Sequence, residues 1–230
     1  HQFNKSKMLY FSPDFIQFFK ELASNNHKDW FDKNRDRYEK EVKLPMQKFV
    51  QDLILEMAKK DKSIKVGPKD CIFRINKDIR FSKDKTPYKI NTSAIISPEG
   101  RKNKDFPGLY IELGPEHVQI YQGAYFIETP KLEMLRKYML KNLSKFNSLV
   151  NDKNFKKNYK SVEGEDQIRL PKEIKDKMDK QPLLSKKQLY WGITLKPEEC
   201  LKKDLLKTVM KHYEIGKPLV DFLAKGLGYR

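Results

Sequence analysis

The chain has 230 residues, of which 38% are hydrophobic and 12% aromatic, enough to bury a core of one large domain or two small ones. No apolar run approaches the roughly 18 residues needed to cross a bilayer, so we predict a soluble protein with no membrane partner. The net charge of +17 favours anionic partners. However, only eight of the 48 basic residues are arginines, and the lysines are scattered as on an ordinary solvated surface. Nucleic-acid binding is therefore expected to be weak and without sequence preference.

The chain contains two cysteines, and they do not form a CxxC motif. Cys71 begins an apolar run and Cys200 lies near the expected start of a helix, so we predict two buried, free thiols. Free thiols, together with the lack of a long apolar stretch before or just after Met8, a candidate start, indicate a cytoplasmic protein.

The first third of the chain, residues 12–61, is predicted to be helical. The Ser-Pro-Asp sequence at residues 12–14 is a typical helix start, and apolar residues follow it at helical spacing. The asparagines at 25–26 end this helix and can cap the next one, which is expected to run over residues 28–42 before Pro45 breaks or restarts it. The apolar face of the third helix consists of Met46, Phe49, Val50, Leu53 and Met57.

Residues 70–126 are predicted to form most of a sheet, because apolar and polar residues alternate in three runs. These runs are residues 73–76, 109–113 and 118–121. A Gly-Pro turn at 114–115 separates the last two and predicts an antiparallel hairpin. An antiparallel sheet can bury one face under helices and leave the other for a ligand.

The last third, residues 129–230, is predicted to be helical with one further strand. Alternating apolar residues place that strand at 189–195. The polar, Lys-rich stretch 142–187 is expected to form loops and short helices. Apolar positions around 205–209 and 219–223 predict two separate C-terminal helices.

Helices at both ends of a largely antiparallel sheet predict an α+β fold, which we expect to form a single domain over residues 8–230. Only ten glycines are present, and they form neither a dinucleotide-binding nor a P-loop motif, so no cofactor is predicted. The four histidines lack the spacing of a zinc site, so no metal is predicted either.

Two segments are candidate functional sites, and the first is a stripe of four residues spaced four apart. These residues are Asn26, Trp30, Asn34 and Tyr38, and on a helix they would share one face. A buried amide needs partners, since leaving it unpaired costs about 1–3 kcal/mol. Two interpretations stay open: Asn26 caps the helix while Asn34 ties it to a neighbouring strand, or the stripe forms one wall of a ligand cleft.

The second candidate is the segment 74–89, where six basic and two acidic side chains leave a charge of +4. Its part from residue 78 to residue 88 is predicted to be an ordered loop, and binding groups concentrate on such loops. Arginines beside carboxylates either form internal ion pairs that pin the loop or hold a phosphate or carboxylate ligand. The candidate ligand-binding residues of this segment are Arg74, Asp78, Arg80, Asp84, Lys85 and Tyr88.

The same segment resembles the signature R-x-x-R-D-x-R-F-x-x-x-D-K-x-x-Y of the domain of unknown function 2461 family. At Lys77 the family pattern has Arg, so here the charge is kept but the planar pair of donors is lost. The NN-x-x-x-WF sequence that begins at Asn25 is also similar to that family. The resemblance covers most of the chain and implies membership of a family, but no particular activity. The matching positions are Arg74, Asp78, Arg80, Phe81, Asp84, Lys85 and Tyr88.

Three functional hypotheses follow from these segments. In the first, the protein binds an anionic small molecule, phosphorylated or not, with or without catalysis; Arg74, Arg80 and Lys85 hold the anion. Asp78 or Asp84 then orients these cations or acts as a base, and the hydroxyl of Tyr88 contributes a further polar group. The second hypothesis is non-specific nucleic-acid binding by the basic surface. The third is a protein-interaction or structural module in which the signature only pins a loop.

The first hypothesis makes a geometric prediction that the other two do not make. It requires Arg74, Arg80 and Tyr88 to converge on an open cleft. If these side chains are instead satisfied by one another and covered, the structural interpretation of the signature is favoured.

Overall fold

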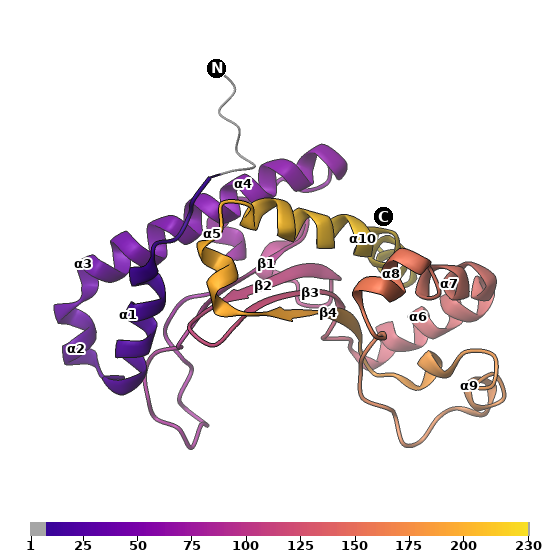
Figure 1. The fold of residues 1–230 in the computed structure, drawn as a ribbon. Coiled ribbons are helices and arrows are strands. Elements are labelled where there is room, and N and C mark those ends of the chain that lie inside the picture. The colour runs from indigo at the N-terminus through magenta and orange to yellow at the C-terminus, as the bar shows by residue number, and fades with distance from the viewer. Residues whose placement is uncertain (1–7, 230) are drawn as a thin grey trace. The chain divides into compact units, whose positions relative to one another are not determined.

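The computed structural model describes residues 8–229; residues 1–7, which precede the candidate start, and Arg230 lie outside the described residues. A four-stranded antiparallel sheet, in the order β1-β2-β3-β4, has helices before and after it in the sequence (Figure 1). This confirms the predicted α+β fold class. The strands are β1 (Thr92–Ile96), β2 (Gly108–Leu113), β3 (Val118–Ala124) and β4 (Leu189–Leu195).

The chain divides into two compact units, each built from three separate stretches. Unit 1 contains the residues up to 101, then 110–120 and 194–210. Unit 2 contains residues 102–109, 121–193 and 211–230. Strands β2, β3 and β4 each have residues in both units.

Unit 1 begins with α1 (Pro13–Ser24), which starts where the sequence predicted. The Ser12 hydroxyl accepts a hydrogen bond from the Asp14 N–H at 3.2 Å and so caps a backbone donor that the helix leaves unpaired. The buried face of α1 consists of Phe15, Phe18, Phe19 and Leu22. The helices that follow are α2 (Lys28–Lys33), α3 (Arg35–Tyr38), a π-helical turn (Glu39–Lys43) and α4 (Leu44–Lys60).

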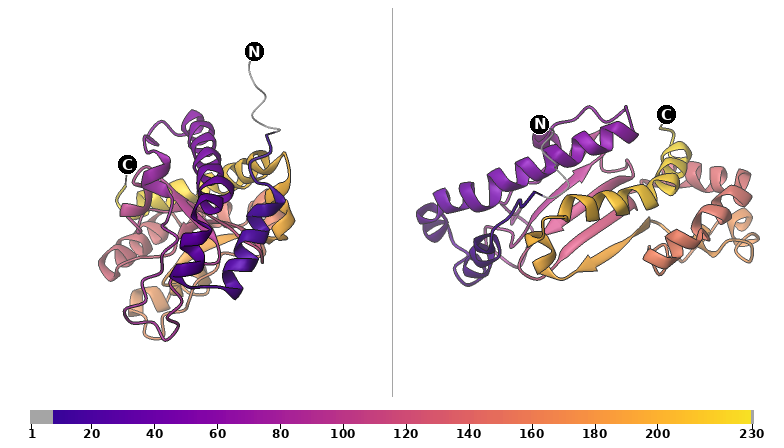
Figure 2. Two further views of the ribbon diagram at one scale, coloured as in Figure 1. Left: turned by 90° about the vertical axis from the view of Figure 1, so that its left-hand side faces the viewer. Right: turned by 45° about the horizontal axis from the view of Figure 1, so that its top comes forward.

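The π-helical turn explains how the chain accommodates Pro45. Proline has no N–H and its ring collides with the preceding turn, so it removes one hydrogen bond of an α-helix and kinks or interrupts the helix. Here the Leu44 N–H bonds to the Glu39 carbonyl, five residues back, and Pro45 then lies in the first turn of α4. The helix therefore restarts at this point, and α3, the π-helical turn and α4 follow one another without a gap (Figure 2).

The predicted strand at residues 73–76 is wrong. This part of unit 1 is extended but joins its neighbours only through isolated bridges, from Ile72 to Ala94 and from Asn76 to Tyr88. The backbone pairing is interrupted because the chain turns away from its neighbours after Asn76 and forms the loop 77–87. A short helix, α5 (Pro68–Cys71), precedes the segment, and α4 and α5 both pack against β1.

Unit 2 contains α6 (Thr129–Lys141), α7 (Leu143–Val150), α8 (Lys153–Asn158), α9 (Lys172–Lys175) and a 3-10 turn (Pro182–Ser185). Leu132, Leu135 and Met139 of α6 are buried and lie at helical spacing. The core of this unit also contains Phe155 and Trp191. The short helices between residues 142 and 187 confirm the expectation for this Lys-rich stretch.

The two predicted C-terminal helices are in fact one, α10 (Leu205–Gly226), with Pro218 inside it. The glycine and proline near its middle resemble a helix break in the sequence, but the glycine has a packing role. A Cβ atom at Gly216 would lie 1.9 Å from Gln122 Oε1 and 2.8 Å from Trp191 Nε1. Gly216 is therefore required where the helix approaches these two side chains closely.

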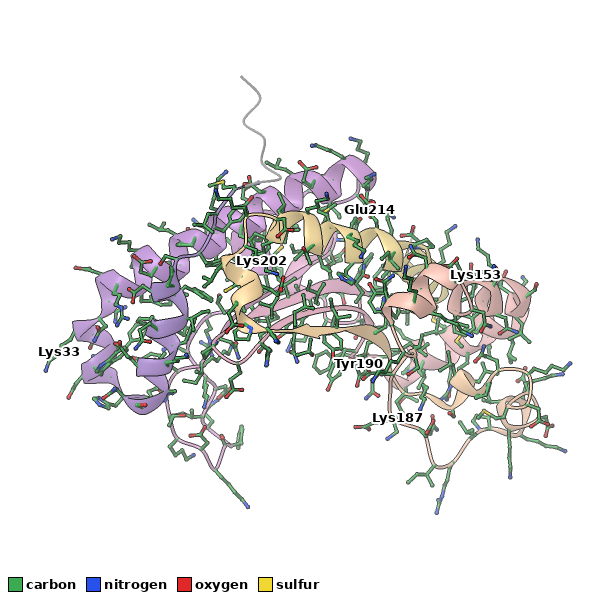
Figure 3. All side chains as sticks on the ribbon, viewed as in Figure 1. Lys33, Lys153, Lys187, Tyr190, Lys202 and Glu214 are labelled. Atoms are coloured by element: carbon green, nitrogen blue, oxygen red, sulfur yellow. The ribbon has the colours of Figure 1, made fainter. Side chains whose placement is uncertain are left out.

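Both cysteines are buried and free, as predicted. Over residues 8–229, no helix combines the length and the apolar character needed to cross a membrane. Lysine side chains extend from several elements, among them Lys33, Lys153 and Lys202 (Figure 3). This distribution agrees with basic charge that is spread over the surface.

Candidate functional site

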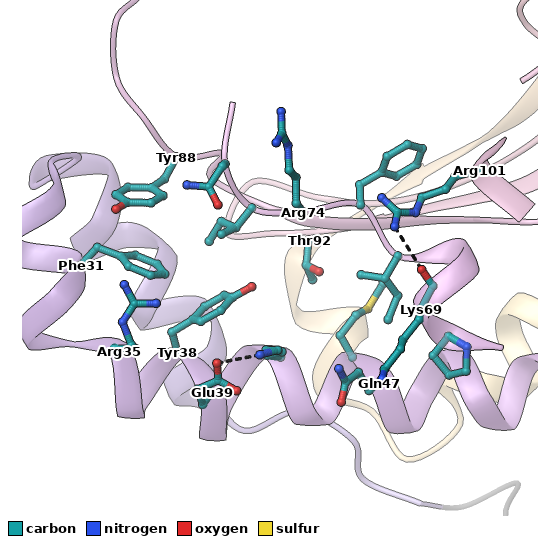
Figure 4. A pocket seen from close by; sticks show the side chains of 17 residues that line it. Phe31, Arg35, Tyr38, Glu39, Gln47, Lys69, Arg74, Tyr88, Thr92 and Arg101 are labelled. Atoms are coloured by element: carbon teal, nitrogen blue, oxygen red, sulfur yellow. Dashed lines mark hydrogen bonds and ion pairs between the residues drawn. The ribbon is translucent and has the colours of Figure 1, made fainter. Parts of the chain in front are cut away.

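An open pocket of about 550 Å³ lies within unit 1, and we call it the arginine pocket. Its walls come from the helical segment 31–47, from α5 and from the extended segment 72–76 (Figure 4). Three of the eight arginines of the chain line it, together with four aromatic side chains. The lining residues that the argument uses are Phe31, Arg35, Tyr38, Lys69, Arg74, Tyr88 and Arg101.

One end of the arginine pocket is aromatic. Phe31 and Tyr88 are buried and stack with ring centroids 4.2 Å apart at an angle of 19°. The Tyr38 ring lies 5.1 Å from Phe31, and the Arg35 guanidinium lies 5.3 Å from the centre of the Phe31 ring. Burial raises the pKa of Tyr38 to about 12, with a smaller contribution from Glu39, so its hydroxyl is neutral at physiological pH.

The other end of the pocket is cationic. In Figure 4, Arg74 lies above the middle of the pocket, and Lys69 and Arg101 lie on the side away from Phe31 and Tyr88. The Arg101 guanidinium donates a hydrogen bond of 3.2 Å to the Lys69 carbonyl. Among the described residues, none of these three cations forms an ion pair with a carboxylate.

The charge of the lining is strongly unbalanced. Five cations line the pocket against a single carboxylate, Glu39, which leaves a net charge of +4. Glu39 is already engaged, because it accepts a hydrogen bond of 2.8 Å from Lys43. Arg35 is paired outside the pocket lining, with Asp32 at 2.6 Å. Within residues 8–229, no ion pair with a carboxylate neutralises the charge of Lys69, Arg74 or Arg101.

Asn26 holds the aromatic end together. Its amide nitrogen donates to the Tyr88 carbonyl at 2.9 Å, and its amide oxygen accepts from the Tyr88 N–H at 3.1 Å. The Asn26 side chain thus pairs with the backbone of Tyr88 as a neighbouring strand would, although the two residues are 62 positions apart. The predicted capping role belongs to its neighbour: the His27 side chain accepts from the Trp30 N–H and caps α2.

Two other residues of the predicted stripe, Trp30 and Asn34, make their contacts outside the arginine pocket. The Asn34 amide donates to the Trp30 carbonyl of its own helix at 2.9 Å, and not to a neighbouring strand. The Trp30 ring packs beside Phe18 at 5.7 Å. Neither Asn34 nor Trp30 lines the arginine pocket, whereas Tyr38 does. The stripe is divided because α2 ends at Asn34, where regular helical spacing is interrupted.

The acidic and basic side chains of the loop 77–87 pair with one another. The Arg80 guanidinium donates to both carboxylate oxygens of Asp78, at 3.0 and 2.7 Å, and lowers the pKa of that carboxyl. Both side chains are largely exposed, and the Arg80 guanidinium also lies 5.9 Å from the Phe81 ring. Phe81 itself is 95% exposed at the tip of the loop.

A second set of contacts closes the same loop. Asp84 accepts from Lys77 at 2.6 Å and from the N–H and hydroxyl of Thr86 at 2.9 and 2.7 Å. The Lys77 ammonium and then the two Thr86 donors hold the pKa of Asp84 well below its usual range. Lys85 donates to the Ile79 carbonyl at 2.9 Å. The lysine that replaces the arginine of the family pattern thus bridges a carboxylate and a hydroxyl, which needs no planar fork.

The residues of the family signature therefore fall into two groups. Arg74 and Tyr88 line the arginine pocket, whereas Asp78, Arg80, Asp84 and Lys85 lie outside its lining. Of the three side chains expected to converge, two reach the pocket, and Arg80 is paired within the loop.

Several pocket residues were not singled out as ligand-binding from the sequence. Lys69 and Thr92 carry no recognisable signal. Arg35 and Arg101 belong to the small set of arginines in a Lys-rich chain, and that scarcity could have indicated them. Scarcity alone is not decisive, because Arg37 forms ion pairs with Asp14 and Glu21 instead of lining the pocket.

Comparison with known proteins agrees with the resemblance noted in the sequence. The model of the family described as "Conserved hypothetical protein (DUF2461)" matches residues 14–222 of the chain. No curated protein matches the sequence.

Proposed function

The chain belongs to the DUF2461 family, and we propose that it binds an anionic small molecule in the arginine pocket. The ligand carries a planar aromatic group and a phosphate or a similar anion. One observation carries this proposal: an aromatic wall and three cations without carboxylate partners line the same open pocket. The volume of about 550 Å³ lies within the range of small-molecule sites, roughly 300–1,000 Å³.

The cationic end suits a phosphate better than a simple halide or a neutral group. Arg74 and Arg101 each offer a planar set of donors that matches the oxygens of a phosphate or a carboxylate. Lys69 adds a point charge beside them. We assign Arg74 the main role in holding the anion, because its guanidinium forms no hydrogen bond among residues 8–229 and extends from a strand-like segment; only its backbone carbonyl is engaged, by Lys89 at 2.8 Å.

The aromatic end suits a flat ring. Phe31 and Tyr88 form a fixed surface, because they are stacked and because Asn26 holds the backbone of Tyr88. The neutral hydroxyl of Tyr38 can donate to a heteroatom of the ligand. In this proposal Tyr88 and Asn26 shape the site, while Asp78, Arg80, Asp84 and Lys85 fix the loop next to it.

The test is a calorimetric titration with AMP, phenyl phosphate and adenosine. We expect both phosphates to bind and adenosine to bind much more weakly. Arg74→Gln should weaken the binding of AMP by about tenfold or more, because a hydrogen bond to a charged group contributes about 1.5–3 kcal/mol. Arg80→Gln is the matched control: it removes a signature arginine that lies outside the lining, and it should leave the affinity unchanged.

Two results would contradict the proposal. One is that neither phosphate binds, which is also what a purely structural role of the signature predicts. The other is an equal loss of affinity in Arg74→Gln and Arg80→Gln, because a general effect of the basic surface, as in non-specific nucleic-acid binding, would not distinguish the two arginines.

A further inference from the structure

We propose that a second pocket, in unit 2, binds an anionic amphiphile: a molecule with an apolar body and one carboxylate or phosphate head. This pocket has a volume of about 380 Å³ and lies among α7, α8, the segment 159–162 and the segment 180–183. We call it the lysine pocket. All its lining residues belong to unit 2, so it is independent of the arginine pocket.

The floor of the lysine pocket is apolar and fixed. Phe155 and Tyr159 are each 3% exposed and Val162 is 7% exposed, and all three belong to the core of unit 2. Phe155 lies edge-on to Trp191 with ring centroids 5.4 Å apart, and the Tyr159 hydroxyl contacts His212 Nδ1 at 2.9 Å. An apolar body placed here would contact a surface that the core already holds in position.

The rim carries only positive charge. Lys156, Lys160 and Lys180 line the pocket, are exposed, and form no ion pair within residues 8–229. No carboxylate lines the pocket. The net charge of the lining is therefore +3, on three flexible side chains that can reach one anionic head.

Two amide side chains of the lining, Asn147 and Gln181, are joined by a hydrogen bond. Asn147 Oδ1 accepts from Gln181 Nε2 at 2.6 Å, and Gln181 Oε1 accepts from the Leu183 N–H at 3.0 Å. Gln181 is only 6% exposed, so this network is fixed. Because both acceptor oxygens are used internally, the Asn147 NH₂ group is left to donate to an anion.

These features together define the class of ligand. A small inorganic anion would satisfy the rim but leave the partly exposed apolar lining, such as Val150 and Leu183, in contact with water. A neutral apolar molecule would cover that lining but leave the three lysines without a counter-charge. An amphiphile satisfies both. Lysine ammonium groups are point charges without the planar fork of arginine, so they accept carboxylate and phosphate heads alike.

The experiment uses octanoate, octyl phosphate, 1-octanol and acetate as probes for calorimetry with the full chain. We expect octanoate or octyl phosphate to bind more tightly than 1-octanol, and acetate to show no binding. The affinity of the two charged octyl probes will show which head is preferred. In a Trp30→Phe background, Trp191 is the only tryptophan, and its emission should change on binding because it packs against Phe155.

A matched pair of variants tests the rim. The triple change Lys156→Gln, Lys160→Gln and Lys180→Gln should weaken octanoate binding by about tenfold, through loss of three partly screened charges. The control triple is Lys153→Gln, Lys157→Gln and Lys177→Gln, which has the same net charge but alters exposed lysines outside the lining. The control should retain the affinity of the wild type.

The proposal is overturned if neither charged octyl probe binds, or if 1-octanol binds as tightly as they do. An equal loss in both triple variants would also overturn it, because the effect would then come from the total charge of the surface. Failure of AMP binding at the arginine pocket would leave these results unaffected, so the experiments test the two proposals independently.

Discussion

The two pockets of this protein are both lined by cations, but they are built in different ways. The arginine pocket gathers residues from Phe31 to Arg101, and a single side chain, Asn26, joins two of its distant walls. The lysine pocket gathers residues from Asn147 to Leu183, and its floor is part of the core of its unit. Its cations are flexible lysines, whereas Arg74 and Arg101 present planar groups.

In the two proposed modes of binding, recognition is fixed by different parts of the ligand, the head or the body. Planar donors and stacked rings constrain the orientation of both ends of a molecule in the arginine pocket. In the lysine pocket, only the apolar body meets a rigid surface, and the charged rim adapts to the head. We therefore expect high selectivity in unit 1 and tolerance of several heads in unit 2.

The largest expected difference between the two regions is a loss of stability at low pH, which arises in unit 2. His212 is buried beside the Tyr159 hydroxyl, and burial, with a smaller effect of Lys211, lowers the pKa of His212 to about 4 from its usual 6.5. Between these pH values the unfolded chain binds a proton that the native state does not bind. The free energy of unfolding should therefore fall by about 3 kcal/mol as the pH drops from about 6.5 to about 4.

Urea unfolding at pH 7 and at pH 4.5 measures this loss. The His212→Gln variant serves as the control, because it cannot take up the proton and should lose much less stability over the same interval. An identical loss in both proteins would place the acid sensitivity elsewhere, for example in the carboxylates. In the arginine pocket, by contrast, the raised pKa of Tyr38 keeps its hydroxyl neutral throughout this interval.

The next largest effect concerns the link between the walls of the arginine pocket. Asn26→Ala leaves the partly buried N–H and C=O groups of Tyr88 without their partner, which should cost about 2 kcal/mol of stability. AMP affinity should fall as well, because Tyr88 would no longer be held against Phe31. Chemical denaturation and calorimetry measure the two effects.

Asn34→Ala is the matched control for this change. Among residues 8–229, its amide bonds only to the Trp30 carbonyl at the end of the same helix, so the loss should be about 1 kcal/mol or less, with AMP binding intact. Equal losses in the two variants would show that Asn26 acts as an ordinary helix-end residue. Octanoate binding in unit 2 should be unchanged in both.

The smallest effect should come from the loop signature. Asp84→Asn weakens the contacts to Lys77 and Thr86, and we expect faster hydrogen exchange at the Thr86 N–H with no change in AMP affinity. Because the pKa of Asp84 is depressed in the folded chain, its contribution is present at neutral pH and is lost on acidification below its usual pKa. A marked loss of AMP affinity would instead assign this carboxylate to the binding site.

Much of the fold could be predicted because local rules and tertiary packing agree. The Ser12 cap, the hairpin between β2 and β3 and the buried face of α4 all follow from residues close in sequence. Two predictions were wrong where a local signal had another cause. The separate apolar clusters at 205–209 and 219–223 predict two helices, but both belong to α10, in which Gly216 allows close packing against Gln122 and Trp191. The alternation at 73–76 predicts a strand, but the segment forms only isolated bridges because the chain turns into the loop 77–87.

The candidate sites were harder to predict, because they depend on contacts between distant segments. The pairing of Asn26 with Tyr88 spans 62 residues, and no spacing rule indicates it. For the same reason the sequence does not indicate that Lys69 and Arg101 lie close together. The Arg101 guanidinium donates to the Lys69 carbonyl, and the two residues are far apart in the chain. The lysine pocket was not foreseen either, because exposed lysines at 156, 160 and 180 look like any others in a chain with 48 basic residues.

The narrow neck of the loop 77–87 has a practical consequence for protein engineering. The chain enters and leaves this loop through one point, where Asn76 pairs with Tyr88 and the Lys77 N–H bonds to the Pro87 carbonyl at 2.9 Å. Beyond that point Phe81 is almost fully exposed, so additional residues there would disturb no buried group. Lengthening a flexible loop costs little stability, about 0.6 kcal/mol for each doubling of the loop length. The tip is therefore a suitable place to graft a peptide tag or a reporter close to the arginine pocket without altering its lining.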